Sequence, residues 1–142
     1  MPKEIINKPG SLNDAEWEVM RRHTVEGQRM LESVGGALTA VGVIVRASHE
    51  HYDGAGYPDG LRGGAIPIEA RVCSVCDAFS AMTTDRAYRS ARSEEEALTE
   101  LRRCAGTQFD PRVVAAFESV LRGRGVVEPM PAQGGGMATA FV

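Results

Sequence analysis

The first half of the chain carries apolar side chains at helical spacing. Leu38, Val41 and Val45 recur every three or four positions, which predicts a helix over about 38–51. His49 continues the same row. Its imidazole is therefore expected on the buried face of that helix.

A second apolar segment, VCSVCDAFSAM at 72–82, is apolar or small nearly all the way round. A helix without a polar face is a buried one, so this pattern predicts a core helix with Asp77 as its single charge. An unpaired buried carboxylate would cost several kcal/mol, roughly. Asp77 therefore needs a cation, and an arginine such as Arg46 or Arg71 is the commoner solution.

A metal ion is the other candidate for that cation. The chain has only three histidines, and His23 and His49 both lie on predicted apolar helix faces. Two imidazole nitrogens with the Asp77 carboxylate suit iron, manganese or zinc. Spacing alone cannot bring three separate helices together, so both alternatives remain open at this point.

Helix starts are clearly marked along the chain. Asn13 with Glu16, and Ser93 with Glu96, have the spacing of capping boxes, and Asp110 precedes a proline. Thr24 and Gly27 are candidate positions for a bend in the first helix. No segment has the alternation of a strand, so the predicted fold class is all-α.

The loop over 53–65 holds five glycines but no known phosphate-binding pattern. It suits either a structural loop or the lip of a ligand site. Cys73 and Cys76 have no second pair, which favours small buried core residues over a zinc or redox site. With three cysteines and no secretory signal, disulfides are not expected.

Composition bounds the possible partners. At 142 residues, with 43% hydrophobic and 25% charged residues, the chain has the size of one domain, predicted over 1–122, followed by a disordered tail over 123–142 rich in Gly, Pro and Ala. A net charge of −3 argues against nucleic acid or an anionic membrane as a partner. No apolar run is long enough for a membrane span and no signal peptide is evident, so cytoplasm is the expected location.

The exact sequences of several segments are more informative than their spacing. EHYDGAGYPDGLRG followed by IPIEARVCSVCDAFSAMTTDRAYR, together with INKPGSL, RH at 22–23 and GTQFDP, resembles the HD-GYP family of bacterial metal-dependent phosphohydrolases. The resemblance implies a helical HD-domain-like bundle that holds two or three metal ions, usually iron or manganese. It also implies hydrolysis of the second messenger cyclic di-GMP or a related dinucleotide.

The resemblance assigns roles to particular residues. Metal ligands fall on His23, His49 and Asp77. Arg86 and Arg89 match basic positions that face the substrate phosphates, a task suited to bidentate guanidinium groups.

The Gly-Tyr-Pro triplet of the family is Gly56, Tyr57 and Pro58. Family members are reported to contact partner signalling proteins through this loop, and we also expect Tyr57 to contact substrate.

Three departures from the family lower the expected activity. The HD pair expected just before INKPGSL is not in the sequence, which implies a bundle incomplete at its N-terminal side. Ser48 stands where the family has the first of two adjacent histidines, and Ser80 replaces a frequent aspartate. We therefore expect a weak or incomplete divalent metal site and an impaired cyclic di-GMP phosphodiesterase. The alternative is a noncatalytic module that binds cyclic di-GMP or a partner protein through the Gly-Tyr-Pro loop.

Missing helices would also leave an apolar face uncovered, expected around Val41, Val45, Val72 and Phe79.

Overall fold

The structure is a computed structural model that describes residues 5, 8, 10–85 and 90–123. Its elements, in chain order, are the helices α2 (Asp14–Val34) and α3 (Ala37–Arg46), the 3-10 turns η1 (Ala47–His49) and η2 (Gly63–Ala65), and the helices α4 (Ile68–Thr83), α5 (Glu94–Arg103) and α6 (Pro111–Leu121). The described part contains one isolated bridge, Ala105 to Phe109, and no strand. The predicted all-α class is confirmed. The tail predicted for 123–142 lies outside the described residues except for Gly123.

Three helices begin where the sequence predicts. The Asn13 side chain accepts a hydrogen bond from the Glu16 amide at 2.9 Å, and the Glu16 carboxylate accepts from the Asn13 amide at 2.8 Å. Ser93 and Glu96 form the same reciprocal box at the start of α5. Asp110 caps α6. Each cap satisfies amides that would otherwise lack a partner.

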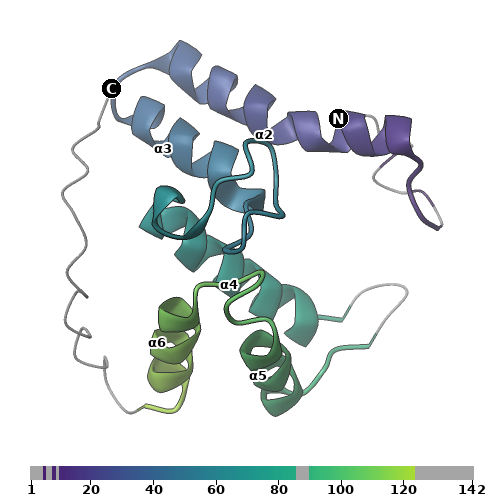
Figure 1. The fold of residues 1–142 in the computed structure, drawn as a ribbon, viewed down its shortest axis with the longest axis vertical. Helices are drawn as coiled ribbons and strands as arrows, with labels where there is room; N and C mark the ends of the chain where they lie inside the picture. The colour runs from purple at the N-terminus through teal and green to yellow at the C-terminus, as the bar shows by residue number, and fades with distance from the viewer. Residues whose placement is uncertain (1–4, 6–7, 9, 86–89, 124–142) are drawn as a thin grey trace.

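Helices α2 and α3 lie side by side (Figure 1) and approach closely through glycine. A Cβ atom on Gly27 would lie 2.9 Å from Val45 Cγ1, and one on Gly42 would lie 3.2 Å from the Gln28 carbonyl oxygen. A restart near Thr24 and Gly27 is not found, because α2 is one helix through both positions, although it changes direction along its length (Figure 1). Gly27 instead allows the two helices to touch.

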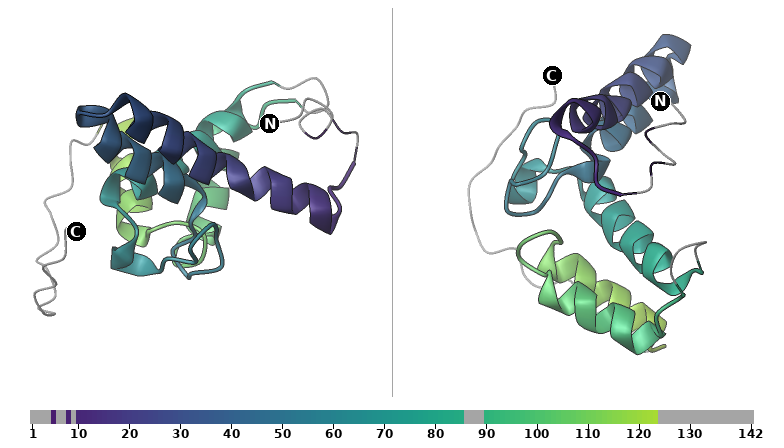
Figure 2. Two further views of the ribbon diagram at one scale, coloured as in Figure 1. Left: turned by 90° about the horizontal axis from the view of Figure 1, so that it is seen from above. Right: turned by 90° about the vertical axis from the view of Figure 1, so that its right-hand side faces the viewer.

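Helix α4 joins two ends of the molecule. Figure 2 shows the α2–α3 pair at one end of the molecule and the α5–α6 pair at the other, with α4 between them. The main core lies at the second end, and its buried members are Val75, Met82, Ala97, Leu98, Leu101, Phe109, Val113 and Val114.

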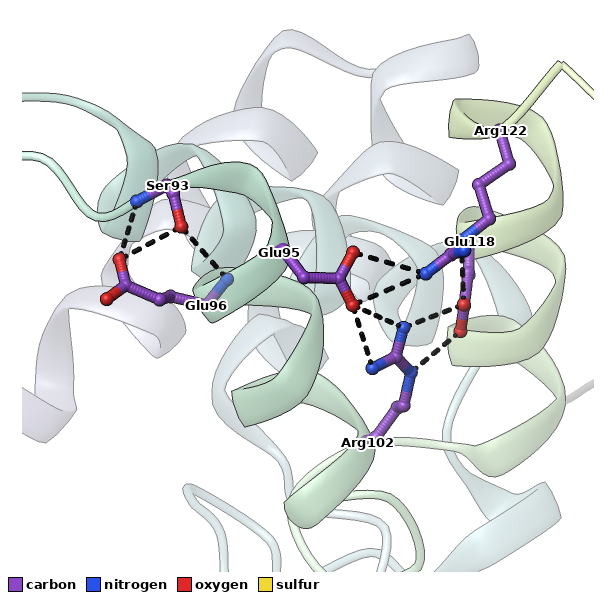
Figure 3. Close-up of polar contacts among 6 residues, drawn as sticks. All are labelled: Ser93, Glu95, Glu96, Arg102, Glu118 and Arg122. Carbon is purple, nitrogen blue, oxygen red and sulfur yellow. Dashed lines mark hydrogen bonds and ion pairs between the residues drawn. The ribbon is translucent and has the colours of Figure 1, made fainter.

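Salt bridges also join α5 to α6 on the surface (Figure 3). Arg102 bonds both Glu95 and Glu118, and Arg122 bonds the same two carboxylates. This network connects the two helices outside the core.

The burial predicted for α4 is wrong over one face. Cys73, Cys76 and Asp77 are exposed, and Val72 is 43% exposed. Among the described residues, α5 and α6 cover only the opposite face of α4, so the apolar sequence does not become an enclosed helix.

The row that ends in His49 is also less buried than predicted. Leu38 and Val41 are 37% and 41% exposed, and His49 is exposed as well. Helix α3 ends at Arg46, and the chain continues to His49 as the turn η1. The α-helix predicted over 38–51 is thus shorter than expected.

The predicted uncovered apolar face is confirmed for Val41 and Val72. It is not found at Phe79, whose ring packs edge-to-face against Phe117 with centroids 5.0 Å apart. Within the described residues, no helix combines the length and apolar character needed to cross a membrane. The cytoplasmic location stays a prediction.

Candidate functional site

Three aromatic rings from separate elements meet at the candidate site. His23 comes from α2, His49 from η1 and Tyr57 from the following loop. The His23 and His49 ring centroids are 5.0 Å apart, with the rings nearly perpendicular. Tyr57 stacks on His49 at 5.1 Å with an interplanar angle of 10°. The structure therefore brings together two of the three predicted metal ligands and the predicted substrate residue.

The protonation of His23 is set by its own helix. Its Nδ1 lies within hydrogen-bonding distance of the Met20 carbonyl oxygen. A carbonyl can only accept, so Nδ1 carries an N–H, and in the neutral tautomer Nε2 keeps a lone pair. Histidines that bind metals are commonly oriented in this way, with the second ring nitrogen donating to a backbone carbonyl.

His49 favours the neutral form. Burial of one side of the ring lowers its pKa, the positive charge of a protonated His23 would lower it further, and Asp77 acts in the opposite direction. Near neutral pH the imidazole is uncharged and free to act as a ligand. Asp77 is thus close enough to His49 for its charge to act on that ring.

Asp77 is not neutralised by either arginine considered from the sequence. Arg46 forms a bidentate pair with Asp59, with a shortest distance of 2.6 Å, and Arg71 pairs with Asp110 at 2.6 Å. Asp77 needs no such partner because it faces solvent.

The exposed side of Asp77 opens into a hollow of about 300 Å³. The rest of this hollow is lined by Ser80, Ala81 and Thr84. Ser80, which replaces a frequent aspartate of the family, therefore lies on its wall. The predicted substrate residues Arg86 and Arg89 follow Thr84 closely in sequence but lie outside the described residues.

The Gly-Tyr-Pro loop folds back onto η1. The Tyr57 amide donates to the His49 carbonyl at 3.1 Å, and the Tyr57–Pro58 peptide is cis. A Cβ atom on Gly56 would lie 2.6 Å from the Glu50 carbonyl carbon, closer than any side chain tolerates. Glycine at this position allows the loop to bring Tyr57 onto His49.

Glu50 is a site residue that the sequence reasoning missed. It is only 3% exposed, and its carboxylate accepts from the Asp59 amide at 2.7 Å and the Leu61 amide at 2.9 Å. These bonds fix the loop after the triplet. Its position directly after His49 in the sequence could have indicated a role at the site. Of the two interpretations of the loop, the structure supports an organised structural loop, and contact with a ligand stays a prediction.

The distant GTQFDP segment supports the same loop. The Tyr52 amide donates to the Gln108 carbonyl at 3.2 Å, and the Asp53 amide donates to the Thr107 carbonyl at 2.9 Å. The segment ends at Asp110, whose buried carboxylate pairs with Arg71. The GTQFDP segment therefore supports the site indirectly, because its backbone carbonyls bind the amides of the loop that carries Tyr57.

The ligand types at the site suit a divalent transition metal, but too few of them are placed together. In the described parts of the chain, no group of three or more His, Cys, Asp or Glu side chains is placed to hold an ion. Ser48 directs its hydroxyl to the Val45 carbonyl at 2.8 Å and is in any case a weak ligand. His23 and His49 together supply two nitrogens, and Asp77 is not placed to complete a ligand set with them.

Comparison with known proteins agrees with this arrangement. The sequence pattern of the HD domain family matches residues 1–113. The chain is 40% identical over 134 residues to the cyclic di-GMP phosphodiesterase response regulator RpfG of Xanthomonas campestris, an alignment that covers 94% of this chain and 35% of that protein. It is 38% identical over 118 residues to a cyclic di-GMP phosphodiesterase of Thermotoga maritima, covering 82% and 32% of the two chains.

Related proteins include one with another cyclic dinucleotide in its name. The 3'3'-cGAMP-specific phosphodiesterase 2 of Vibrio cholerae is 35% identical over 115 residues, covering 80% of this chain and 22% of that protein. The crystal structure of a cyclic GMP-AMP specific phosphodiesterase of Vibrio cholerae superposes with a TM-score of 0.66 at 21% identity, over 84% of this chain and 31% of that one. The latter likeness shows the fold. This chain spans about a third of the length of the first two relatives.

Proposed function

This chain belongs to the HD domain family, and from that premise we propose that it binds a cyclic dinucleotide such as cyclic di-GMP at the face formed by His23, His49 and Tyr57. The reaction class is hydrolysis of a phosphodiester bond. The relatives named above carry that activity in their names.

The convergence of His23 and His49 carries the proposal. Two imidazoles whose ring centroids lie 5.0 Å apart, one with its tautomer fixed and the other held neutral, are poised to act as ligands or hydrogen-bonding groups. A purely structural pair would more commonly be buried and satisfied by protein partners, whereas His49 is exposed.

A divalent ion, iron or manganese by the chemistry of the donors, would be held by His23, His49 and Asp77. When bound, such an ion polarises a phosphoryl oxygen and lowers the pKa of water. We propose that this chain holds at most one ion, weakly, because Ser48 supplies no imidazole and two nitrogens with one oxygen leave the site short of ligands.

The chain's own residues position the substrate. Tyr57, stacked on His49, offers a flat apolar surface beside the site for a base or sugar. We propose that Arg86 and Arg89 bind the phosphates, as bidentate guanidinium groups do elsewhere. Asp77 and Ser80 line the hollow on α4.

A noncatalytic role is the second candidate. It is favoured by the shortage of metal ligands in the described residues and by the engagement of the Ser48 hydroxyl. In that case the ordered loop at Gly56, Tyr57 and Pro58 would bind a dinucleotide or a signalling protein without hydrolysis.

Calorimetric titration with cyclic di-GMP tests the binding proposal. We expect saturable binding, and we expect His49→Ala to weaken the affinity about tenfold, because the loss of one charge-assisted hydrogen bond changes a dissociation constant by that factor. His51→Ala is the matched control, expected to stay within about twofold. Equal affinities of the two variants would contradict the assignment of the site.

Turnover and metal content separate the two candidates. Cyclic di-GMP is incubated with the protein and added manganese or iron, and metal is counted after dialysis. Slow, metal-dependent hydrolysis that Asp77→Ala abolishes would favour a weak phosphodiesterase, and binding without hydrolysis would favour the module. Two tightly retained ions per chain would contradict the proposed single weak site.

A further inference from the structure

We infer that Arg21 is a phosphate-binding residue of this site, on the α2 side of Tyr57. The inference rests on the proposed function, because its ligand is the phosphodiester of the same cyclic dinucleotide. The sequence motifs place the substrate-binding arginines at Arg86 and Arg89, and Arg21 lies outside all of them.

The position of Arg21 is the first observation. Its guanidinium carbon lies 5.9 Å from the centroid of the Tyr57 ring, a cation–π distance. The same ring stacks on His49 at 5.1 Å and meets His23 edge-on at 6.4 Å. The guanidinium is thus held at the border of the histidine pair, where a ligand of that pair would reach it.

The unused donors of Arg21 are the second observation. Its neighbour Arg22 pairs with Glu18 at 3.7 Å, Arg46 is held by Asp59, and Arg71 is held by Asp110. The Arg21 side chain forms no ion pair and donates no hydrogen bond to any residue that the structure describes. Contact with an aromatic ring places a guanidinium without consuming its five N–H donors.

The electrostatics of the ring agree with this position. Burial raises the pKa of Tyr57, and the positive charge of Arg21 acts against that rise. A charge that reaches the phenol also reaches a ligand lying on it. Asp77, near His49, would repel a phosphodiester in the absence of bound metal, and the charge of Arg21 offsets that repulsion.

The chemistry of the ligand follows from these features. A planar fork of donors with no acceptor among the described residues, beside the histidine pair, matches the nonbridging oxygens of a phosphodiester, which accept two parallel N–H bonds. A carboxylate would also satisfy the fork. The adjacent flat ring of Tyr57 favours a ligand that carries a nucleobase.

The experiment measures the affinity of the full 142-residue chain for cyclic di-GMP by calorimetry, in the wild type and in Arg21→Ala, Arg21→Gln and Arg22→Ala. We expect both Arg21 variants to bind about tenfold more weakly, the usual size for loss of a charge-assisted pair. Arg22→Ala removes the same charge from the next position on α2 and is expected to stay within about twofold. Affinity should fall with added salt in the wild type and less steeply in the Arg21 variants.

Each result decides between distinct failures. If the wild type binds and Arg21→Gln binds equally well, the inference about Arg21 is overturned and the proposed function stands. The glutamine removes the charge while keeping much of the side-chain length. Equal weakening by Arg21→Ala and Arg22→Ala would also overturn it, since a general charge effect would then suffice. No binding by the wild type would overturn the proposed function, and this inference with it.

Discussion

The two ends of the molecule differ in how they are held together. At the α5–α6 end, the main core has eight buried side chains, of which Val75, Ala97 and Leu101 are fully buried. At the α2–α3 end, Thr24 is the buried residue of α2 and Gly42 that of α3. The candidate site lies at this less buried end. The molecule therefore separates the region that supplies stability from the region that carries the chemistry.

The same contrast appears in two arginine–aspartate pairs of similar geometry. The side chains of Arg71 and Asp110 are 10% and 0% exposed, whereas those of Arg46 and Asp59 are 32% and 35% exposed. Both pairs have a shortest distance of 2.6 Å. Since solvent screens the second pair, burial and not geometry sets the cost of losing each one.

Loss of the buried pair is the largest effect that we predict. Arg71→Ala leaves the buried Asp110 carboxylate with only its exposed partner Arg112, which should lower the free energy of unfolding by about 3 kcal/mol, the lower end for a broken buried pair. Arg46→Ala, at the other end, should cost at most about 1 kcal/mol. Urea unfolding followed by circular dichroism measures both, and equal losses would remove the contrast between the two ends.

The buried pair also predicts a pH dependence. Burial raises the pKa of Asp110, but the bonds from Arg112 and Arg71 outweigh this and hold it below its usual value near 3.8. The stability from this group is thus complete above that value and is lost as pH falls through the lower pKa of the folded state. Unfolding measured from pH 7 to pH 2 should show this loss, and it should be smaller in Asp110→Asn.

A matched pair of leucines tests the contrast in apolar burial. Leu101→Ala empties a fully buried site and should cost about 3 kcal/mol. Leu38→Ala removes the same atoms from a side chain that is 37% exposed and should cost about 1 kcal/mol or less. The midpoints of urea unfolding give both values. A cost for Leu38→Ala as large as that for Leu101→Ala would show that the α2–α3 end is more enclosed than described.

The loop beside the site should be sensitive to a smaller change. Glu50→Gln replaces one acceptor oxygen with an amide donor that faces either the Asp59 or the Leu61 amide, so we expect a loss of about 1–3 kcal/mol. Hydrogen exchange of those two amides should accelerate more than that of amides in α5. Unchanged exchange at both positions would mean that the carboxylate does not hold the loop.

The surface network of Arg102 and Arg122 should matter least. Its members are largely exposed, so Arg102→Ala should give a small loss of stability that disappears at 1 M salt, where exposed charges are screened within about 3 Å. A loss that persists in high salt would indicate packing of the side chain instead of charge.

The sequence predicted local structure better than burial. Asn13, Ser93 and Asp110 mark helix starts correctly, because capping depends on residues within one turn. The enclosure of Asp77 was predicted wrongly, because an apolar sequence indicates a need for cover and not the presence of a covering element.

The candidate site was predicted from the resemblance more than from spacing. His23, His49 and Tyr57 do lie together. Glu50 and Arg21 were missed because their roles depend on a loop that turns back on itself at Gly56. Arg86 and Arg89 remain predictions.

Nitrogen-detected NMR of the imidazole rings tests the central claim most directly, because the chain has only three histidines. The account predicts that cyclic di-GMP shifts the signals of His23 and His49 in a saturable way and leaves those of His51 nearly unchanged. Shifts confined to His51, or none at saturating ligand, would contradict it.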